Sequence, residues 1–170
     1  MSSNEIKVPI LSLWQPWATA VVTPDILNDN QPIKLNETRH WATKIRGRVL
    51  IHASKKWNKS IEQILLNWPF RHYMGELGIN ASSLGVIVGS IEITDCITSE
   101  QWVSENLPST DDAILAQALM GNFEPGRFIF KLANPVRFAE YIPFKGMQTP
   151  FVRIPLSTIP QQYHKDFKAV

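Results

Sequence analysis

The sequence predicts an α+β fold, a small mixed β-barrel with peripheral helices. Short apolar segments rich in β-branched residues recur between turn signals, as they do in small barrels. Twelve prolines among 170 residues imply many short elements. No strand–helix–strand rhythm, which a parallel α/β sheet would need, is present. A hydrophobic content of 44% supports one core. We therefore expect a single domain over 1–170, with its core at about 8–156 and a C-terminal tail at 157–170.

The first half of the chain is expected to form two strands and two helices. Proline fits the first turn of a helix and disfavours a helical residue before it, so Pro16 and Pro24 bracket a helix that ends near Thr23. Apolar residues at 61, 64, 65 and 68 follow the 3.6-residue period of an amphipathic helix. The strands are expected at Val8–Leu13 and Arg48–Ala53, and the second helix at Asn58–Asn67.

The second half is expected to open with a long, bent strand over Leu84–Ile97, in which Gly85 and Gly89 mark bulges or close backbone approaches. Thr110 or Asp111 can cap a helix that Gly121 stops. The other expected elements are helices at Ser99–Glu105 and Asp111–Met120 and strands at Arg127–Leu132, Val136–Ile142 and Pro150–Ile154, with prolines at the strand ends.

Charge is segregated along the chain, although the net charge is only +2. Residues 34–59 hold eight Lys or Arg against one Glu, whereas residues 72–126 hold eight Asp or Glu and no Lys or Arg. Residues 127–170 return to a balance of +5. This predicts a basic face, which would concentrate anionic ligands, and an acidic face, which could serve a protein partner. The alternative is that the two blocks pair across the fold.

Several classes of protein are disfavoured by what the sequence lacks. One cysteine, Cys96, excludes an internal disulfide and thiolate zinc motifs, and the four histidines have no metal-ligand spacing. No phosphate loop, dinucleotide fingerprint or Gly-x-Ser-x-Gly motif occurs. No run reaches the roughly 20 apolar residues of a membrane span, and the first residues do not resemble a signal peptide. We therefore expect a soluble, cytoplasmic protein without metal, cofactor or membrane contact.

The strongest candidate site is 34–48, where five cations surround one carboxylate, one indole and two hydroxyls. Ionised groups are costly to bury without partners, so this cluster must be solvated, self-paired or facing a charged ligand. Trp41, Thr43, Lys44 and Arg46 supply the aromatic and cationic groups that bind single-stranded nucleic acids. The segment therefore predicts a cleft for nucleic acid or a nucleotide-like ligand.

Within this segment, Lys34, Glu37 and Arg39 form a Lys-x-x-Glu-x-Arg pattern. On a regular strand Glu37 and Arg39 share one face and Lys34 lies on the other, so the three converge only if a bulge or turn lies near residues 35–36. The structural interpretation is a surface ion pair of Glu37 with Arg39, which stabilises little. The functional one is a buried pair in a cleft, where Lys34 faces the ligand and could do acid–base chemistry.

Two flanking pairs are further candidates. Trp14 fits either packing or a ligand surface, and Gln15 adds an amide able to read a base edge, at a helix start whose free N–H groups favour phosphate. Lys55 and Lys56 follow a predicted strand, where loops carry binding groups, although a solvated lysine pair is the simpler interpretation.

Three segments carry a family pattern: Leu11–Ala18, the block from Lys34 to Trp41 with its following strand to Ala53, and Val86–Cys96. Asn134-Pro135 and Pro143-Phe144-Lys145-Gly146 extend it. Together they resemble the ASCH (activating-signal-cointegrator homology) domain family of the PUA-like superfamily. The resemblance implies a PUA-like β-barrel whose cleft, lined by the Lys-x-x-Glu-x-Arg block, binds RNA or DNA.

The resemblance also implies a rival function. Some small bacterial ASCH proteins are amidohydrolases that act on N4-acetylcytidine through a lysine, a threonine and a glutamate. Lys34 matches that lysine, but Glu37 stands at the threonine position, with Thr38 one place away. The catalytic set would then be Lys34 with Glu37 and Glu92.

We therefore expect a nucleic-acid-binding module that prefers RNA, with single strands as the candidate form. The alternatives are the amidohydrolase and a protein-interaction domain that uses the acidic segment 72–126. A binding module needs no catalytic residue. The expected nucleic-acid-binding residues are Trp14, Gln15, Lys34, Glu37, Arg39, Trp41, Thr43, Lys44, Arg46, Lys55 and Lys56.

Overall fold

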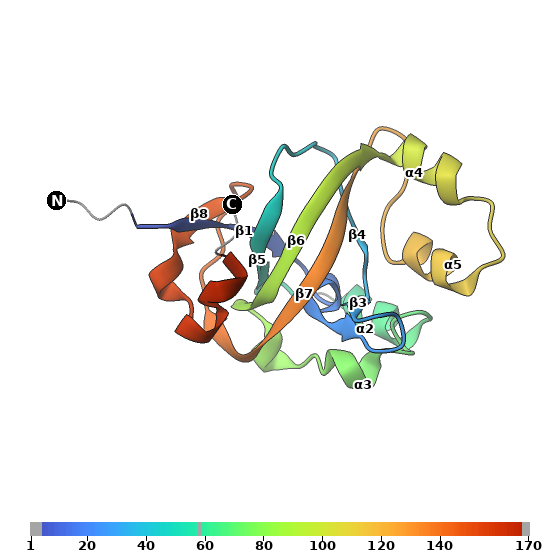
Figure 1. Ribbon diagram of the computed structural model, residues 1–170. Coiled ribbons are helices and arrows are strands. Elements are labelled where there is room, and N and C mark those ends of the chain that lie inside the picture. Colours follow the sequence, from blue (N-terminus) through green and yellow to red (C-terminus); the bar gives the residue numbers. More distant parts are fainter. Residues whose placement is uncertain (1–4, 58, 168–170) are drawn as a thin grey trace.

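Six strands form one mixed sheet in the order β4-β7-β6-β5-β1-β8 (Figure 1). The structure is a computed structural model that describes residues 5–57 and 59–167. β1 pairs with β5 in parallel, and the other neighbours are antiparallel. A separate two-stranded ribbon joins β2 (Pro24–Asp25) to β3 (Gln31–Pro32). The sheet strands are β1 (Lys7–Leu13), β4 (Asn36–Arg39), β5 (Gly47–Ala53), β6 (Val86–Thr98), β7 (Phe128–Pro143) and β8 (Val152–Pro155).

The sheet is open. No backbone ladder among residues 5–57 and 59–167 joins the edge strand β4 to the edge strand β8. The mixed α+β class is therefore as expected, but a closed barrel is not confirmed. Both edge strands have four residues, which is too short to pair along the full length of the 13-residue β6 or the 16-residue β7.

Helices surround the sheet. α1 (Trp17–Val22) places Ala18, Val21 and Val22 in the main core, against apolar residues of β1, β5, β6 and β7. Figure 1 shows α4 and α5 as a lobe beyond the β4 side of the sheet, with α2 and α3 below it. These helices are α2 (Lys59–Leu66), α3 (Met74–Leu77), α4 (Ser99–Asn106) and α5 (Asp112–Leu119). Three 3-10 helices are η1 (Ala81–Ser83), η2 (Leu156–Thr158) and η3 (Gln161–Phe167).

Most elements lie where local patterns predict them. Thr98 caps α4 by accepting from Gln101 N, and Asp111 caps α5 by accepting from Ala113 N. The amphipathic helix is present as α2, although the expected first residue, Asn58, lies outside the described residues. Close approach at Gly89 is also confirmed, because a Cβ atom there would lie 2.2 Å from the carbonyl oxygen of Val136.

One expectation about the strands is wrong. The strands expected at 127–132 and 136–142 are a single strand, β7, and Pro135 lies in its middle. Asn134 adopts a φ of 53° there, and the register with β6 shifts between Ser90 and Glu92. Such a bulge releases the proline from the ladder, so the strand continues through it.

The C-terminal segment packs on the far side of the sheet from α4 and α5. Leu156 and Ile159 are buried with Val8, Ile10 and Leu50, and Tyr163 stacks on Phe138 at 4.0 Å between ring centroids. Residues 156–167 thus cover the β1 and β5 side of the molecule, which leaves the β4 side to the site described next.

Candidate functional site

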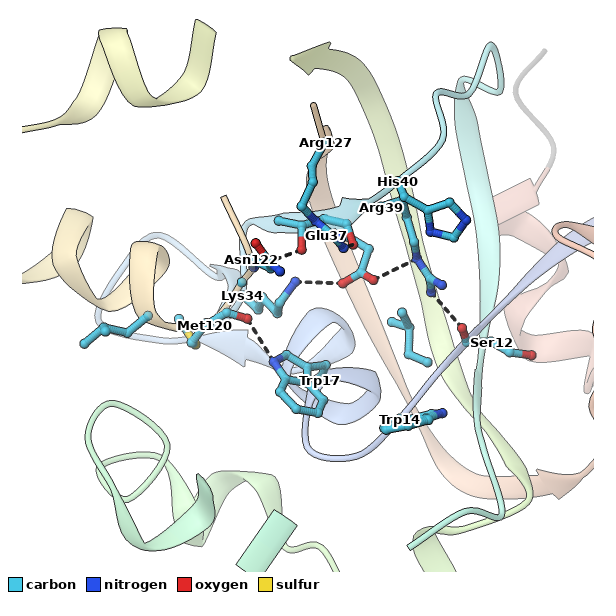
Figure 2. Close-up of a pocket in the computed structure, with 14 residues that line it drawn as sticks. Ser12, Trp14, Trp17, Lys34, Glu37, Arg39, His40, Met120, Asn122 and Arg127 are labelled. Atoms are coloured by element: carbon cyan, nitrogen blue, oxygen red, sulfur yellow. Dashed lines mark hydrogen bonds and ion pairs between the residues drawn. The ribbon is translucent and has the colours of Figure 1, made fainter. Parts of the chain in front are cut away.

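A pocket of about 450 Å³ lies between β1, the segment leading into β4, and the chain that follows α5 (Figure 2). This volume is within the roughly 300–1,000 Å³ of small-molecule sites. Among the described residues that line it, three are Lys or Arg and one is a carboxylate. The lining comprises Ser12, Leu13, Trp14, Trp17, Lys34, Glu37, Thr38, Arg39, His40, Leu119, Met120, Gly121, Asn122 and Arg127.

The backbone around Lys34 is fixed by three other elements. Lys34 N donates to Ala20 O of α1 at 3.2 Å, and Leu132 N of β7 donates to Leu35 O at 2.9 Å. The side-chain amide of Gln117 on α5 donates to Ile33 O and accepts from Leu35 N, both at 2.8 Å. Gln117 therefore holds the residues on both sides of Lys34, which sets the direction of the lysine side chain.

Lys34 and Glu37 form a buried ion pair on the floor of the pocket. Lys34 is 1% exposed, and its Nζ atom lies 2.7 Å from Glu37 Oε2 and also donates to Asn36 O. Glu37 Oε1 lies 3.0 Å from Arg39 Nε. Because Lys34 precedes β4 in a bend, it escapes the strand alternation and reaches the same side as Glu37. The three residues converge, and the surface-pair interpretation is wrong.

Burial dominates the electrostatics of Lys34. It lowers the pKa of the ammonium group, the Glu37 carboxylate raises that pKa by less, and the Arg39 guanidinium lowers it again. A buried charge is tolerated only when an opposite charge compensates it. Removing one member of a buried ion pair typically costs about 3–5 kcal/mol of stability.

Arg39 connects two strands that are not neighbours in the sheet. Its Nη2 atom donates to Ser12 O of β1 at 2.8 Å, although β7, β6 and β5 lie between β4 and β1 in strand order. The sheet therefore curls until the β4 side faces β1, and a side chain bridges the gap. We call this gap the β4–β1 seam. Figure 2 shows Arg39 reaching across it toward Ser12, with Glu37 and then Lys34 in line on its other side.

The opposite wall comes from the chain after α5. Trp17 Nε1 donates to Met120 O at 2.9 Å, and Asn122 N donates to Thr38 Oγ1 at 3.0 Å. Arg127 Nη2 donates to Thr38 O at 3.3 Å. Arg127 and Asn122 are not among the residues predicted from the sequence. One feature of the sequence points to Arg127, which is the first Lys or Arg after the acidic segment 72–126.

Trp14 and Gln15, which precede α1, differ in their surroundings. Trp14 is 43% exposed at the pocket edge, with Lys56 Nζ 4.8 Å from its ring centroid. Gln15 is fully buried, and its amide binds Thr19 Oγ1 at 2.8 Å and Ser83 O at 2.9 Å. The expectation that Gln15 faces a ligand is wrong, because its polar groups hold α1 to η1.

Four predicted residues lie on the loop between β4 and β5 and do not line the pocket. Trp41 packs edge-on against Phe130 and Phe151, with centroid separations of 5.3 and 5.6 Å. Thr43 accepts from Ile45 N, and Lys44 is exposed. Arg46 pairs with Asp95 at 3.1 Å.

Two remaining candidates lie elsewhere. Lys55 lines a second pocket beyond β1. Glu92 of β6 pairs with Arg48 at 3.4 Å and accepts from Asn134, so it does not share the pocket of Lys34. The Arg46 and Arg48 pairs also join the basic block to the acidic one, so pairing across the fold is realised at these two sites.

The described residues provide neither a cluster of metal ligands nor a membrane-spanning helix. Over residues 5–57 and 59–167, no three His, Cys, Asp or Glu side chains are grouped so that they could hold a metal ion. In the same part of the chain, no helix has the length and apolar character needed to cross a membrane.

Comparison with known proteins identifies one family. The ASCH domain family matches residues 11–110, which include the floor of the pocket. A solved structure described as ASCH from Zymomonas mobilis is similar over 94% of this chain and 92% of that chain, with 12% identity and a TM-score of 0.44. No curated protein matches the chain.

Proposed function

Because the chain belongs to the ASCH domain family, we propose that it is an RNA-binding module that holds one nucleotide of a single strand in the pocket of Figure 2. The observation that carries the proposal is the composition of that pocket, in which Lys34, Arg39 and Arg127 outnumber Glu37. Excess positive charge in a concave site attracts phosphate. The preference for RNA follows what is commonly proposed for the family.

Each wall of the pocket suits a different part of a nucleotide. Guanidinium groups bind phosphate with two donors in a fixed plane, so Arg127 and Arg39 are the phosphate contacts. The indole of Trp14 offers an exposed ring for stacking, which is worth about 1–3 kcal/mol per base. Glu37, held by Lys34, is an acceptor for an exocyclic amine or a ribose hydroxyl.

In this proposal the curled sheet is a variant of the PUA-like barrel. In a closed barrel a ladder of backbone hydrogen bonds would join the strands at the β4–β1 seam, whereas here the side chain of Arg39 bridges it. The loop residues Trp41, Thr43, Lys44 and Arg46 then lie outside the nucleotide site. Lys44 is exposed there and could approach the strand only beyond the bound nucleotide.

Arg127→Gln tests the proposal. Labelled single-stranded RNA, single-stranded DNA and duplex RNA should be titrated by fluorescence anisotropy at about 50 and 200 mM salt. We expect the variant to bind RNA at least about fivefold more weakly than the parent. The log–log salt slope should also be smaller by about 0.7, because one phosphate contact is lost. Arg71→Gln removes the same charge from an exposed site outside the pocket and should bind as the parent does. Absence of saturable, salt-sensitive binding by the parent protein would refute the proposal.

A second candidate function is hydrolysis of a modified nucleoside such as N4-acetylcytidine. It is favoured by the lowered pKa of Lys34, which brings a buried amine closer to a role in proton transfer. Against it, the Nζ atom is already engaged by Glu37 and Asn36. Incubation with N4-acetylcytidine followed by chromatography for cytidine tests it, with Lys34→Ala as the inactive control. We expect no cytidine from either protein.

A further inference from the structure

The second pocket, on the other side of β1, has the character of a phosphate-binding site. It encloses about 930 Å³ and is lined by the ends of β5 and β7, the start of β6 and the loop that follows β7. Its described lining contains two lysines, Lys55 and Lys145, and no carboxylate. Both lysines are exposed, and the described lining gives neither an acidic partner. Unpaired cations at a concave surface raise the local concentration of anions.

Backbone comes close to the pocket at two glycines. A Cβ atom on Gly85 would lie 2.8 Å from Lys55 Cγ, and one on Gly146 would lie 2.5 Å from Cε1 of His52. Gly85 also has a φ of +68°, which other residues rarely adopt. The aliphatic part of Lys55 therefore packs against the backbone of Gly85, and the imidazole of His52 packs against the backbone of Gly146. The second contact places the loop after β7 at the pocket wall.

The polar floor is formed by a buried histidine and a serine from neighbouring strands. His52 is 3% exposed, and its Nδ1 atom lies 2.8 Å from Ser12 Oγ. Burial lowers the pKa of His52 more than a hydrogen bond to the backbone of Phe144 raises it. The imidazole is therefore neutral at neutral pH, and positive charge in this pocket comes from Lys55 and Lys145.

Ser12 belongs to both pockets. Its carbonyl oxygen accepts from Arg39 on the nucleotide side, and its hydroxyl faces His52 on the other. Figure 2 shows the carbonyl turned toward Arg39 and the side chain turned away from it. The end of β1 is thus the wall between the pockets, and Trp14, with Lys56 over its ring, stands beside that wall.

From this continuity we propose that an RNA strand bound in the first pocket crosses the end of β1 beside Trp14 and places its next phosphates in the second pocket, on Lys55 and Lys145. The inference rests on the proposed function and extends it from one nucleotide to a strand path. Along this path a strand would meet the basic first pocket, then the ring of Trp14 with Lys56 over it, and then the basic second pocket. That is the arrangement in which cations follow the backbone and rings hold bases.

The experiment compares two variants on one probe, a labelled RNA hexanucleotide of mixed sequence. Lys55→Gln/Lys145→Gln should weaken binding about 25-fold at 0.1 M salt, because a contact with a slope of about 0.7 is worth about fivefold there. Its log–log salt slope should be smaller by about 1.4. The charge-matched control is Lys59→Gln/Lys165→Gln, which changes two exposed lysines outside both pockets and should bind as the parent does.

The two proposals fail in different ways. If Arg127→Gln weakens binding and Lys55→Gln/Lys145→Gln does not, the second pocket is refuted while the first stands. If only the double lysine variant weakens binding, the first pocket is refuted and the second is a separate RNA site, which overturns the continuous path. If neither variant differs from its control, both are refuted.

A second measurement does not depend on the variants being folded. In the parent protein, acetylation of Lys55 and Lys145 measured by mass spectrometry should be slowed severalfold by the hexanucleotide. The same concentration of an unphosphorylated ribonucleoside, which has no phosphate for Lys55 and Lys145 to bind, should not slow it. Equal protection of Lys59 and Lys165 would overturn the inference.

Discussion

Lys34 is the residue at which burial, charge and the proposed function meet. A lysine that is 1% exposed remains in the fold because Glu37 and the Asn36 carbonyl bind its Nζ atom, and because Gln117 fixes the backbone on either side. Glu37 is held between Lys34 and Arg39. Its carboxylate therefore has a fixed orientation at the pocket floor, which is a condition for selective hydrogen bonding to a ligand.

The lowered pKa of Lys34 predicts a pH dependence of stability. Between that lowered pKa and the ordinary value of 10.5, the unfolded chain binds the proton more readily than the folded chain. The free energy of unfolding should therefore rise with pH across this window. Urea denaturation from neutral pH to about pH 10, for the parent and for Lys34→Met, measures it.

Subtracting the pH dependence of Lys34→Met from that of the parent leaves the contribution of Lys34, because both proteins share the other lysines. In Lys34→Met the free energy of unfolding should rise less with pH than in the parent. An equal rise in both proteins would contradict the lowered pKa of Lys34 as its cause. The range stops at about pH 10 because Tyr73, whose pKa is raised to about 12 by burial, contributes with the opposite sign above it.

Among the elements, α5 shapes the pocket through the side chain of Gln117 and through the turn at its C-terminal end. Its Gln117 holds residues 33 and 35, and the turn at its end supplies Met120 and Asn122 to the wall. The Asp111 cap fixes where this helix begins. The helix therefore positions two opposite sides of one cavity.

Gln117→Ala should destabilise the protein by about 1–3 kcal/mol, because Ile33 O and Leu35 N lose their side-chain partner in a part-buried place. It should also weaken RNA binding, since Lys34 and Glu37 would lose their fixed positions. Denaturant unfolding and anisotropy titration measure the two effects. Gln101→Ala on α4 is the control, because that side chain is exposed and donates to Glu105 of the same helix. Its stability should stay within about 0.5 kcal/mol of the parent, and equal effects in both variants would contradict the role given to Gln117.

At the scale of the whole molecule, local signals predicted elements well and long-range placement poorly. The helix α2 follows from its periodicity, α5 from its cap and its terminal glycine, and β5 from its apolar β-branched run. The burial of Gln15 cannot be predicted from local patterns, because it depends on Ser83, 68 residues away. Arg127 was missed because only the pairing of Arg39 with Phe128 brings it beside the pocket.

The curl of the sheet was equally inaccessible to a reading of short patterns. A closed barrel and an open sheet share the same strands, and the difference lies in whether the edges pair. The convergence of Lys34 with Glu37 could be stated only as a condition, a turn near residues 35–36, because spacing alone does not decide between a strand and a bend.

The β4–β1 seam predicts where a ligand should change backbone protection. β4 is a four-residue edge strand that pairs only with β7 in the described sheet, so its amides should open readily. RNA bound in the pocket should slow hydrogen exchange in residues 36–39 and 119–122 and leave residues 86–93 of the central β6 unchanged. Exchange measured by mass spectrometry with and without the hexanucleotide tests this. Uniform slowing across the chain would contradict a pocket at the seam.

The hydrogen bond from Trp17 to Met120 joins residues 103 positions apart, and this separation has a consequence for the order of folding. Contacts between distant parts of a chain form late, because loop closure must precede them. The pocket requires the first helix, the segment before β4 and the turn after α5 to be in place together, so a partly folded chain has no site for the nucleotide. A ligand that binds only the finished protein adds stability in proportion to the logarithm of its concentration. Recovery of RNA binding during refolding should accordingly lag behind recovery of helical circular dichroism, and the ligand would act as a reporter of complete folding.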